Sequence, residues 1–147
     1  MGLYRDILTQ PVSDLDLREV VTLPPESTLR DAIEAMRKHR LGFVICVDDA
    51  GELHGCFTER HLIKALLSGT DMGDKLLAHV APVTARVREA DPISLVVEKM
   101  LFGDERFVLV VDAEDRPIAL TGQRGVVEFV TEHFPRQIKV QVMDSKL

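Results

Sequence analysis

Apolar and polar residues follow two kinds of pattern along this chain, and the same succession of patterns occurs twice. Apolar residues recur at i, i+3, i+4 and i+7 over residues 29–36, and a continuous apolar run follows at residues 43–47. The first pattern predicts a helix with one face on a core, and the second predicts a buried strand. The later succession has an apolar run at residues 107–111, after a stripe formed by Ile93, Val96, Val97 and Met100.

The two successions are copies of one unit. Residues 21–66 align with residues 85–130 at a constant offset of 64 and without a gap. The identical pairs are Glu34 and Glu98, Met36 and Met100, Phe43 and Phe107, Val44 and Val108, Val47 and Val111, Asp48 and Asp112, and Arg60 and Arg124. Two copies of a small unit are typical of a domain whose halves bury each other. The sequence therefore predicts a duplicated module.

Boundary signals give each copy the order strand, helix, strand, strand, helix. Thr28 followed by Asp31 predicts a capping box at the start of the first helix. In the second copy, Asp91 as the cap and Pro92 at the first helical position predict the same boundary. The remaining elements are expected at residues 20–23, 53–57, 85–87, 117–121 and 124–133, with another helix after Thr58 that closes near Gly69.

We expect one module over residues 1–147, with the first repeat at 15–69 and the second at 79–134. The tail, residues 135–147, has Ile138, Val140 and Val142 in alternation with polar residues. Such alternation favours an edge strand or a strand that pairs with a partner, and a disordered tail is the alternative. Both remain open at this point.

Composition narrows the class of protein. The chain is 46% hydrophobic and 29% charged, which is typical of a soluble globular domain, and no apolar run approaches the ~20 residues that span a bilayer. No signal peptide is recognisable at the start, so a cytoplasmic location is expected. The net charge is −6, and the 18 basic residues are scattered. This distribution argues against nucleic acid as a partner, and the lack of a long apolar run argues against a membrane.

Little in the sequence suggests a metal or a catalyst. Cys46 and Cys56 would face each other in a hairpin folded about Gly51, and we interpret them as small buried hydrophobic residues rather than a disulfide. There is no His/Cys cluster with zinc-ligand spacing and no recognisable catalytic motif. Asp48 and Asp112 end their strands, where an Asp satisfies turn amides. We therefore expect no metal, no catalytic residues and no enzyme.

The chain resembles a tandem pair of CBS domains, known as a Bateman module. The resemblance in the first copy rests on residues 21–24 (VTLP), 28–36, 41–48 and 51–62. In the second copy it rests on residues 85–87, 107–112 and 123–126. Membership implies an α/β fold of two βαββα repeats, packed through their sheets around a pseudo-twofold axis, with two clefts between the halves.

The resemblance also implies a regulatory ligand. Many members of the family bind AMP, ADP, ATP or S-adenosylmethionine in these clefts. The base lies among apolar strand residues, the Asp of a (Ser/Thr)-x-x-Asp motif meets the ribose, and basic side chains meet the phosphates. This suits a nucleotide because a carboxylate accepts both ribose hydroxyl protons and basic donors form charge-assisted bonds to phosphate.

The matching positions favour the first copy as the ligand site. His61 stands where the motif has its Asp, and the second copy has Gly125 there. His61 could donate to a ribose or phosphate oxygen, or it could mark a lost site. The helix start beside Arg60 favours an anion, and the alternative for both Arg60 and Arg124 is an exposed charge or a salt bridge. The candidate ligand-binding residues are Thr22, Leu41, Gly42, Phe43, Thr58, Arg60, His61 and Arg124.

The sequence thus predicts a regulatory CBS pair that senses an adenosine-containing nucleotide, forms a homodimer through apolar helix faces and acts on an unidentified partner protein. One alternative is a ligand-free interaction or dimerisation module with degraded nucleotide sites. Another is a sensor of a different anionic metabolite. The absence of a ribose carboxylate in both copies favours the ligand-free module, and Thr58 with Arg60 favours the nucleotide sensor.

Overall fold

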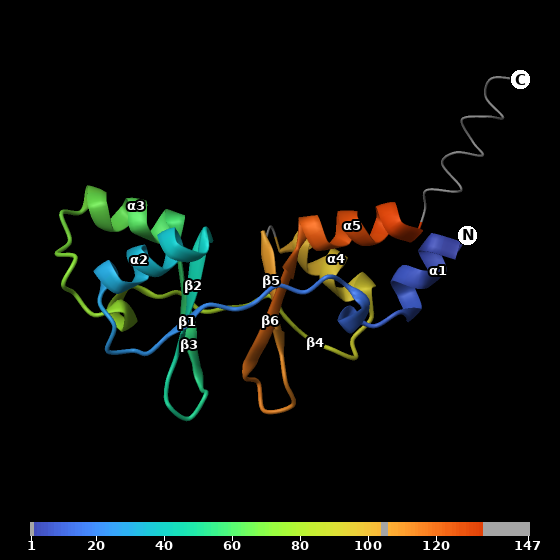
Figure 1. Ribbon diagram of the computed structural model, residues 1–147, viewed down its shortest axis with the longest axis horizontal. Coiled ribbons are helices and arrows are strands. Elements are labelled where there is room, and N and C mark those ends of the chain that lie inside the picture. Colours follow the sequence, from blue (N-terminus) through green and yellow to red (C-terminus); the bar gives the residue numbers. More distant parts are fainter. Residues whose placement is uncertain (1, 104–105, 134–147) are drawn as a thin grey trace, which may run out of the picture. The chain divides into compact units, whose positions relative to one another are not determined.

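The computed structural model describes residues 2–103 and 106–133, which form two compact units (Figure 1). The first-repeat unit contains residues 19–84 and 112–118, and the second-repeat unit contains the other described residues. The predicted tail strand at 135–147 lies outside the described residues. The expected limits of the repeats, 15–69 and 79–134, stay predictions.

The first-repeat unit is a three-stranded sheet with its helices on one face (Figure 1). The sheet has the order β1-β2-β3, in which β2 runs parallel to β1 and antiparallel to β3. Its elements are β1 (Thr22–Leu23), α2 (Leu29–His39), β2 (Phe43–Val47), β3 (Leu53–Thr58), α3 (Glu59–Leu67) and the 3₁₀ turn η2 (Leu76–His79).

The capping box predicted for α2 is confirmed. The hydroxyl oxygen of Thr28 accepts from the backbone N–H of Asp31 at 3.2 Å, and the Asp31 carboxylate accepts from the N–H of Thr28 at 2.9 Å. The two bonds satisfy backbone donors that have no partner within the helix.

Helix α3 ends near Gly69, as predicted. Gly69 follows the C-cap residue Ser68 with a φ of +66°, a conformation that glycine adopts without steric cost.

The second-repeat unit has the same core architecture, a β4-β5-β6 sheet with helices on one face (Figure 1). Its elements are α1 (Gly2–Thr9), the 3₁₀ turn η1 (Val12–Asp14), β4 (Arg86–Arg88), α4 (Ile93–Phe102), β5 (Phe107–Val111), β6 (Pro117–Gly122, in this unit from residue 119) and α5 (Gln123–His133). Helix α1, which was not predicted from the sequence, packs on α4.

The predicted start of α4 was wrong by one residue. Pro92 is the N-cap, with extended backbone at a φ of −69° and a ψ of 148°, and the helix begins at Ile93. Asp91 does not cap the helix, because its carboxylate accepts instead from the backbone N–H of Arg88 at 2.8 Å. The side chain thus closes the turn after β4, and this local bond competes with the capping geometry.

The duplication predicted from the sequence extends to the strand register. Thr22 pairs with Ile45 and Leu23 with Cys46, and the residues 64 positions later, Arg86 with Leu109 and Val87 with Val110, pair in the same way. The fold therefore repeats residue by residue, although few side chains are identical.

Each unit also includes a short segment that lies just before the other repeat in the sequence. In the first-repeat unit, the N–H of Leu29 donates to the carbonyl of Asp74 and the N–H of Leu76 donates to Ser27. In the second-repeat unit, the N–H of Ile93 donates to Gln10 and that of Val12 to Asp91. These partners are again 64 positions apart, so the structural duplication begins earlier than the sequence alignment indicated.

The central strands are buried on both faces, as their continuous apolar runs predict. Val44 and Cys46 belong to the hydrophobic core of the first-repeat unit, while Phe43 and Ile45, on the opposite face by strand alternation, are also buried. The largest buried side chain of this core is Phe57.

The predicted pairing of the two cysteines was wrong by one residue. Cys56 lies opposite Ile45, and Cys46 lies opposite Gly55, so the two thiols point to opposite faces of the sheet. A bulge between Cys46 and Val47 shifts the register before the turn. Both cysteines are buried and neither forms a disulfide, as expected from the sequence.

Candidate functional site

The start of α3 brings four of the predicted ligand-binding residues together. Thr58 ends β3 and is the N-cap of α3, and it pairs across the sheet with Phe43. The N–H of Glu59 donates to the carbonyl of Gly42 at 3.0 Å, which fixes the helix start against the beginning of β2. His61 lies at the third helical position, beside the Thr58 cap. This group, Gly42, Phe43, Thr58 and His61, is called the α3 site below.

His61 takes the capping role that a carboxylate usually fills at this position. Its Nδ1 accepts from the backbone N–H of Thr58 at 3.0 Å and also lies 3.0 Å from the Thr58 hydroxyl. In return, the Thr58 hydroxyl oxygen accepts from the N–H of His61 at 3.4 Å. Because Nδ1 is an acceptor here, the neutral imidazole carries its proton on Nε2. His61 therefore offers the site a donor and no carboxylate.

Burial and positive neighbours favour the neutral form of His61. Burial of the half-buried ring, followed by the charges of Lys64 and Arg60, lowers the pKa of His61 below its usual 6.5. The ring also contacts Phe57, with 6.0 Å between the ring centroids. The first-repeat unit thus holds a neutral histidine at neutral pH.

This arrangement predicts a pH-dependent contribution of His61 to stability. The unfolded chain takes up the His61 proton at about pH 6.5, and the folded chain takes it up only at lower pH. The contribution is therefore complete above about pH 6.5 and is lost as the pH falls through the folded pKa. We expect denaturant unfolding to show a larger loss of stability from pH 7.5 to pH 5 for the wild type than for His61→Gln.

Gln is the matched control because its amide oxygen can cap the helix but does not titrate. All other ionisable groups are common to the two proteins, so their contributions cancel in the difference. An equal loss of stability in the wild type and in His61→Gln would contradict the capping role of a neutral His61.

Gly42 has the Glu59 side chain beside it rather than an open space. A Cβ atom on Gly42 would lie 2.6 Å from Oε1 of Glu59, closer than real Cβ contacts allow. The Glu59 carboxylate therefore rests against the backbone at the beginning of β2. Gly42 was predicted to be a ligand-binding residue, and the structure places a flexible acidic side chain beside it.

The other predicted site residues of the first repeat are arranged around this group. Leu41 is partly buried against the core, and Phe43 is buried. Arg60 is exposed in the first turn of α3, where the helix N-terminus also favours an anion. Thr22 is on β1, at the far side of β2 from Thr58 and level with Ile45, so the backbone does not place it beside the α3 site.

The equivalent position in the second-repeat unit has a different chemistry. Arg124 is largely exposed, and its Nε donates to Glu128 at 3.2 Å. Gly125 is buried, and a Cβ there would lie 2.6 Å from the hydroxyl oxygen of Thr121. Thr121 is 3% exposed, and its hydroxyl has no hydrogen-bond partner within the described residues. This helix start has neither an imidazole nor a carboxylate on its third residue.

One cluster of polar residues was not predicted from the sequence. Asp48, Glu52 and His54 meet at the turn between β2 and β3, although the sequence was interpreted as lacking a metal-ligand pattern. A signal was present, because residues 52 and 54 are two apart near a strand and such residues share one face. A search limited to Cys and His spacing could not find it.

Comparison with known proteins places this fold in a family. The CBS domain model matches residues 12–68. The solved structure of CBS domain protein PAE2072 from Pyrobaculum aerophilum, complexed with AMP, is 22% identical, with a TM-score of 0.71 over 78% of this chain and 88% of that chain. The chain carries a CBS domain and has the fold of a CBS-domain pair. The resemblance stated from the sequence is confirmed.

Two further proteins are similar to this chain, one in fold and one in sequence. The CBS domain pair of protein MJ0100, in complex with 5′-methylthioadenosine and S-adenosyl-L-methionine, is 20% identical, with a TM-score of 0.73 over 85% of this chain and 98% of that chain. Arabinose 5-phosphate isomerase KdsD of Pseudomonas aeruginosa is 30% identical over 63% of this chain, and the match spans 28% of that enzyme.

CBS-domain pairs are generally regulatory rather than catalytic, and several bind small adenosine ligands. Within residues 2–103 and 106–133, no helix has the length and apolar character needed to cross a membrane.

Proposed function

We propose that this CBS pair is a regulatory module that senses an adenosine-containing nucleotide at the α3 site. The observation that carries the proposal is the Thr58 and His61 capping box at the start of α3, set against Gly42 and Phe43 in a CBS domain. PAE2072 in complex with AMP, and MJ0100 with 5′-methylthioadenosine and S-adenosyl-L-methionine, support this class of ligand.

Each residue has a role that its position allows. The apolar side chain of Leu41 contacts the base, and the His61 Nε2–H donates to a ribose hydroxyl oxygen. Arg60, at the N-terminus of α3, binds the phosphate, because a guanidinium and a helix N-terminus both favour an anion. Thr22 stays a predicted contact. Arg124 is not needed, since Glu128 already pairs with it.

The regulatory effect follows from differential binding. A nucleotide that binds one arrangement of the two units, or of a homodimer, more tightly than another shifts the population toward it. The partner protein that reads this shift is unidentified. We propose that the module is cytoplasmic and does not itself catalyse a reaction.

A thermal-shift titration tests the nucleotide proposal. At 100 times its dissociation constant, a ligand adds about 2.7 kcal/mol to the native state, which corresponds to a rise in Tm of roughly 5–10 °C for a chain of this size. We expect a dose-dependent rise with at least one of AMP, ADP, ATP and S-adenosylmethionine. For a phosphate-containing ligand, Arg60→Ala should lose most of the rise.

Arg30→Ala is the matched control, because Arg30 is also an exposed arginine in the first turn of a helix of the same unit. It should keep the full response. No response to any of these compounds, or equal responses of the two arginine variants to every phosphate-containing ligand, would count against the α3 site as a nucleotide sensor.

A second candidate function, a ligand-free dimerisation module, is favoured by the exposed apolar face of α3. Ile63, Leu66 and Leu67 are 58%, 59% and 85% exposed, although they lie on a helix whose other face is in the core. Exposed apolar residues grouped on one helix are typical of an interface. A homodimer in sedimentation analysis, together with no change in Tm on addition of nucleotides, would favour the dimerisation module as the function.

A further inference from the structure

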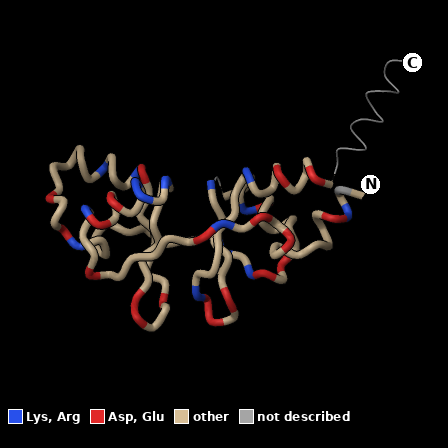
Figure 2. Tube along the Cα trace, viewed as in Figure 1, with Lys and Arg blue, Asp and Glu red and all other residues tan. Residues whose placement is uncertain are grey.

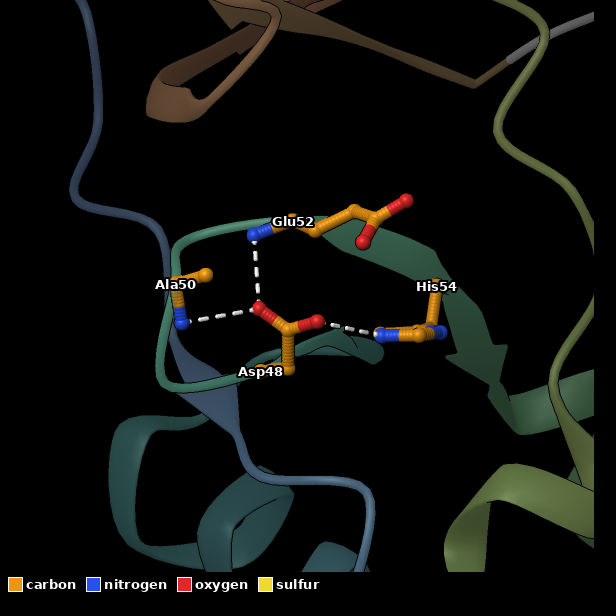
Figure 3. A network of polar contacts seen from close by, with 4 residues as sticks. All are labelled: Asp48, Ala50, Glu52 and His54. Carbon is orange, nitrogen blue, oxygen red and sulfur yellow. Dashed lines mark hydrogen bonds and ion pairs between the residues drawn. The ribbon is translucent and has the colours of Figure 1, made fainter.

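The turn between β2 and β3 holds three side chains with metal-ligating atoms (Figure 3). Asp48 follows β2, Glu52 precedes β3, and His54 lies on β3. One ligand atom from each residue lies within 4.8 Å of the other two, and the Asp48 Oδ2 to His54 Nε2 distance is 2.9 Å. The turn is at the opposite end of β3 from Thr58, so this cluster is separate from the α3 site.

The second repeat shows that the turn itself needs only the aspartate. Asp48 Oδ1 accepts from the backbone N–H groups of Ala50 and Glu52, each at 2.9 Å. Asp112 Oδ1 accepts from Glu114 and Arg116 at the same distances. The two turns are thus built alike.

The two turns differ in the other two cluster positions. At the offset of 64, Arg116 replaces Glu52 and Ile118 replaces His54. Acidic residues gather at both turns (Figure 2), but only the first turn adds an imidazole. Formation of the hairpin therefore does not account for the His54 and Glu52 side chains.

The geometry holds Asp48 ready to bind a cation. Two backbone amides fix its Oδ1, which leaves Oδ2 facing His54 (Figure 3). Outer hydrogen bonds of this kind orient metal-ligating carboxylates.

The donor set indicates the class of metal. Mg²⁺ and Ca²⁺ prefer oxygen ligands alone, whereas an imidazole with carboxylates suits zinc and neighbouring first-row metals. The residues lie on the surface of the turn, with about a third of each of the Asp48 and His54 side chains exposed, so an ion has access from solvent and water can complete its coordination.

We propose that Asp48, Glu52 and His54 form a binding site for a divalent first-row transition metal ion, with zinc as the representative. Asp48 Oδ2, a carboxylate oxygen of Glu52 and His54 Nε2 are the ligands. His54 Nε2 must give up the hydrogen bond to Asp48 and bind as the unprotonated nitrogen, with the ring proton on Nδ1. Binding ties the two strands of the hairpin together at their turn.

Isothermal titration of the untagged full chain with Zn²⁺, and with Co²⁺ followed by visible absorption, tests this site. We expect one ion per chain at this site, and at least tenfold weaker binding for both His54→Gln and Glu52→Gln. The two substitutions are on the surface, and unchanged melting in metal-free buffer establishes that the variants are folded. Mg²⁺ should not compete at equal concentration.

His79→Gln is the matched control. His79 Nε2 lies 3.3 Å from Asp74, a similar pair that has no third metal-ligating residue within the described part of the chain. This variant should bind zinc as the wild type does. Absence of zinc binding by the wild type, or equal affinities of the wild type and His54→Gln, overturns the proposal. Neither result depends on the nucleotide response of the α3 site.

Discussion

The variant His61→Asp is expected to bind AMP or ATP at least tenfold more tightly than the wild type. A carboxylate at this position can accept protons from both ribose hydroxyls, whereas the neutral His61 can only donate from Nε2. Hydrogen bonds to a charged group contribute about 1.5–3 kcal/mol each, so even one such bond in full corresponds to tenfold or more in affinity.

The substitution should leave the helix start intact, because the same chain already contains the required geometry. Thr28 and Asp31 form a Thr-x-x-Asp capping box at the start of α2, with the Asp31 carboxylate 2.9 Å from the N–H of Thr28. An Asp at position 61 can cap Thr58 in the same way and keep lone pairs free for a ribose.

Calorimetric titration of His61→Asp and of His61→Asn separates charge from shape. Asn offers an oxygen to the cap but has no charge, so its affinity gain should be smaller. Folded His61→Asp protein with no gain in nucleotide affinity would show that the α3 site does not hold a ribose. The ligand-free module would then be the better account of this chain.

The repeats and strands could be predicted because they depend on local patterns. The apolar runs at 43–47 and 107–111 became β2 and β5 with the predicted limits, and the Thr28 capping box formed as expected. Each of these features is fixed by neighbours in sequence or by burial on both faces of a strand. Their prediction needed no knowledge of distant contacts.

Features set by distant contacts were missed. Nothing local in the segment around Val12 says that its N–H pairs with Asp91, yet this contact carries the N-terminal segment to the second repeat. The cysteine register failed because Val47 pairs with Leu53, which centres the turn on Ala50 rather than Gly51, and the bulge after Cys46 reverses only one residue of that two-residue shift. A hairpin drawn symmetrically about Gly51 cannot include such an insertion.

The candidate site was predictable in part. Alignment with the family motif located Thr58 and His61, and the structure brings them together with Gly42 and Phe43. The role of His61 as an acceptor for a backbone N–H could not be read from the motif, because it depends on the ring orientation. Likewise, the Glu59 carboxylate over Gly42 depends on a side-chain rotamer.

Gly125→Asp places a carboxylate in the second repeat at the position that matches His61 in the first. We expect this substitution to destabilise the protein, whereas His61→Asp should leave it folded. Gly125 occupies the position equivalent to His61, but a Cβ atom there meets the Thr121 hydroxyl oxygen at 2.6 Å. Thr121 is buried and its hydroxyl sits on a short, stiff side chain, so it has little room to withdraw. Overpacking of this kind costs about 1–3 kcal/mol. We expect Gly125→Asp to lower the free energy of unfolding by about that amount.

A double-mutant cycle isolates the cause. Gly125→Ala introduces only the Cβ atom, and Thr121→Ala removes the hydroxyl that it meets. Because Ala is preferred to Gly in a helix by up to about 1 kcal/mol, Gly125→Ala should become stabilising once Thr121 is Ala. The cycle is measured by denaturant unfolding, and additive effects of the two changes would remove the steric explanation. An acidic residue in the first turn of a helix is usually favourable. A loss of stability in Gly125→Asp would be the opposite of that tendency. The packing around Thr121 would then explain why this repeat has a glycine at position 125.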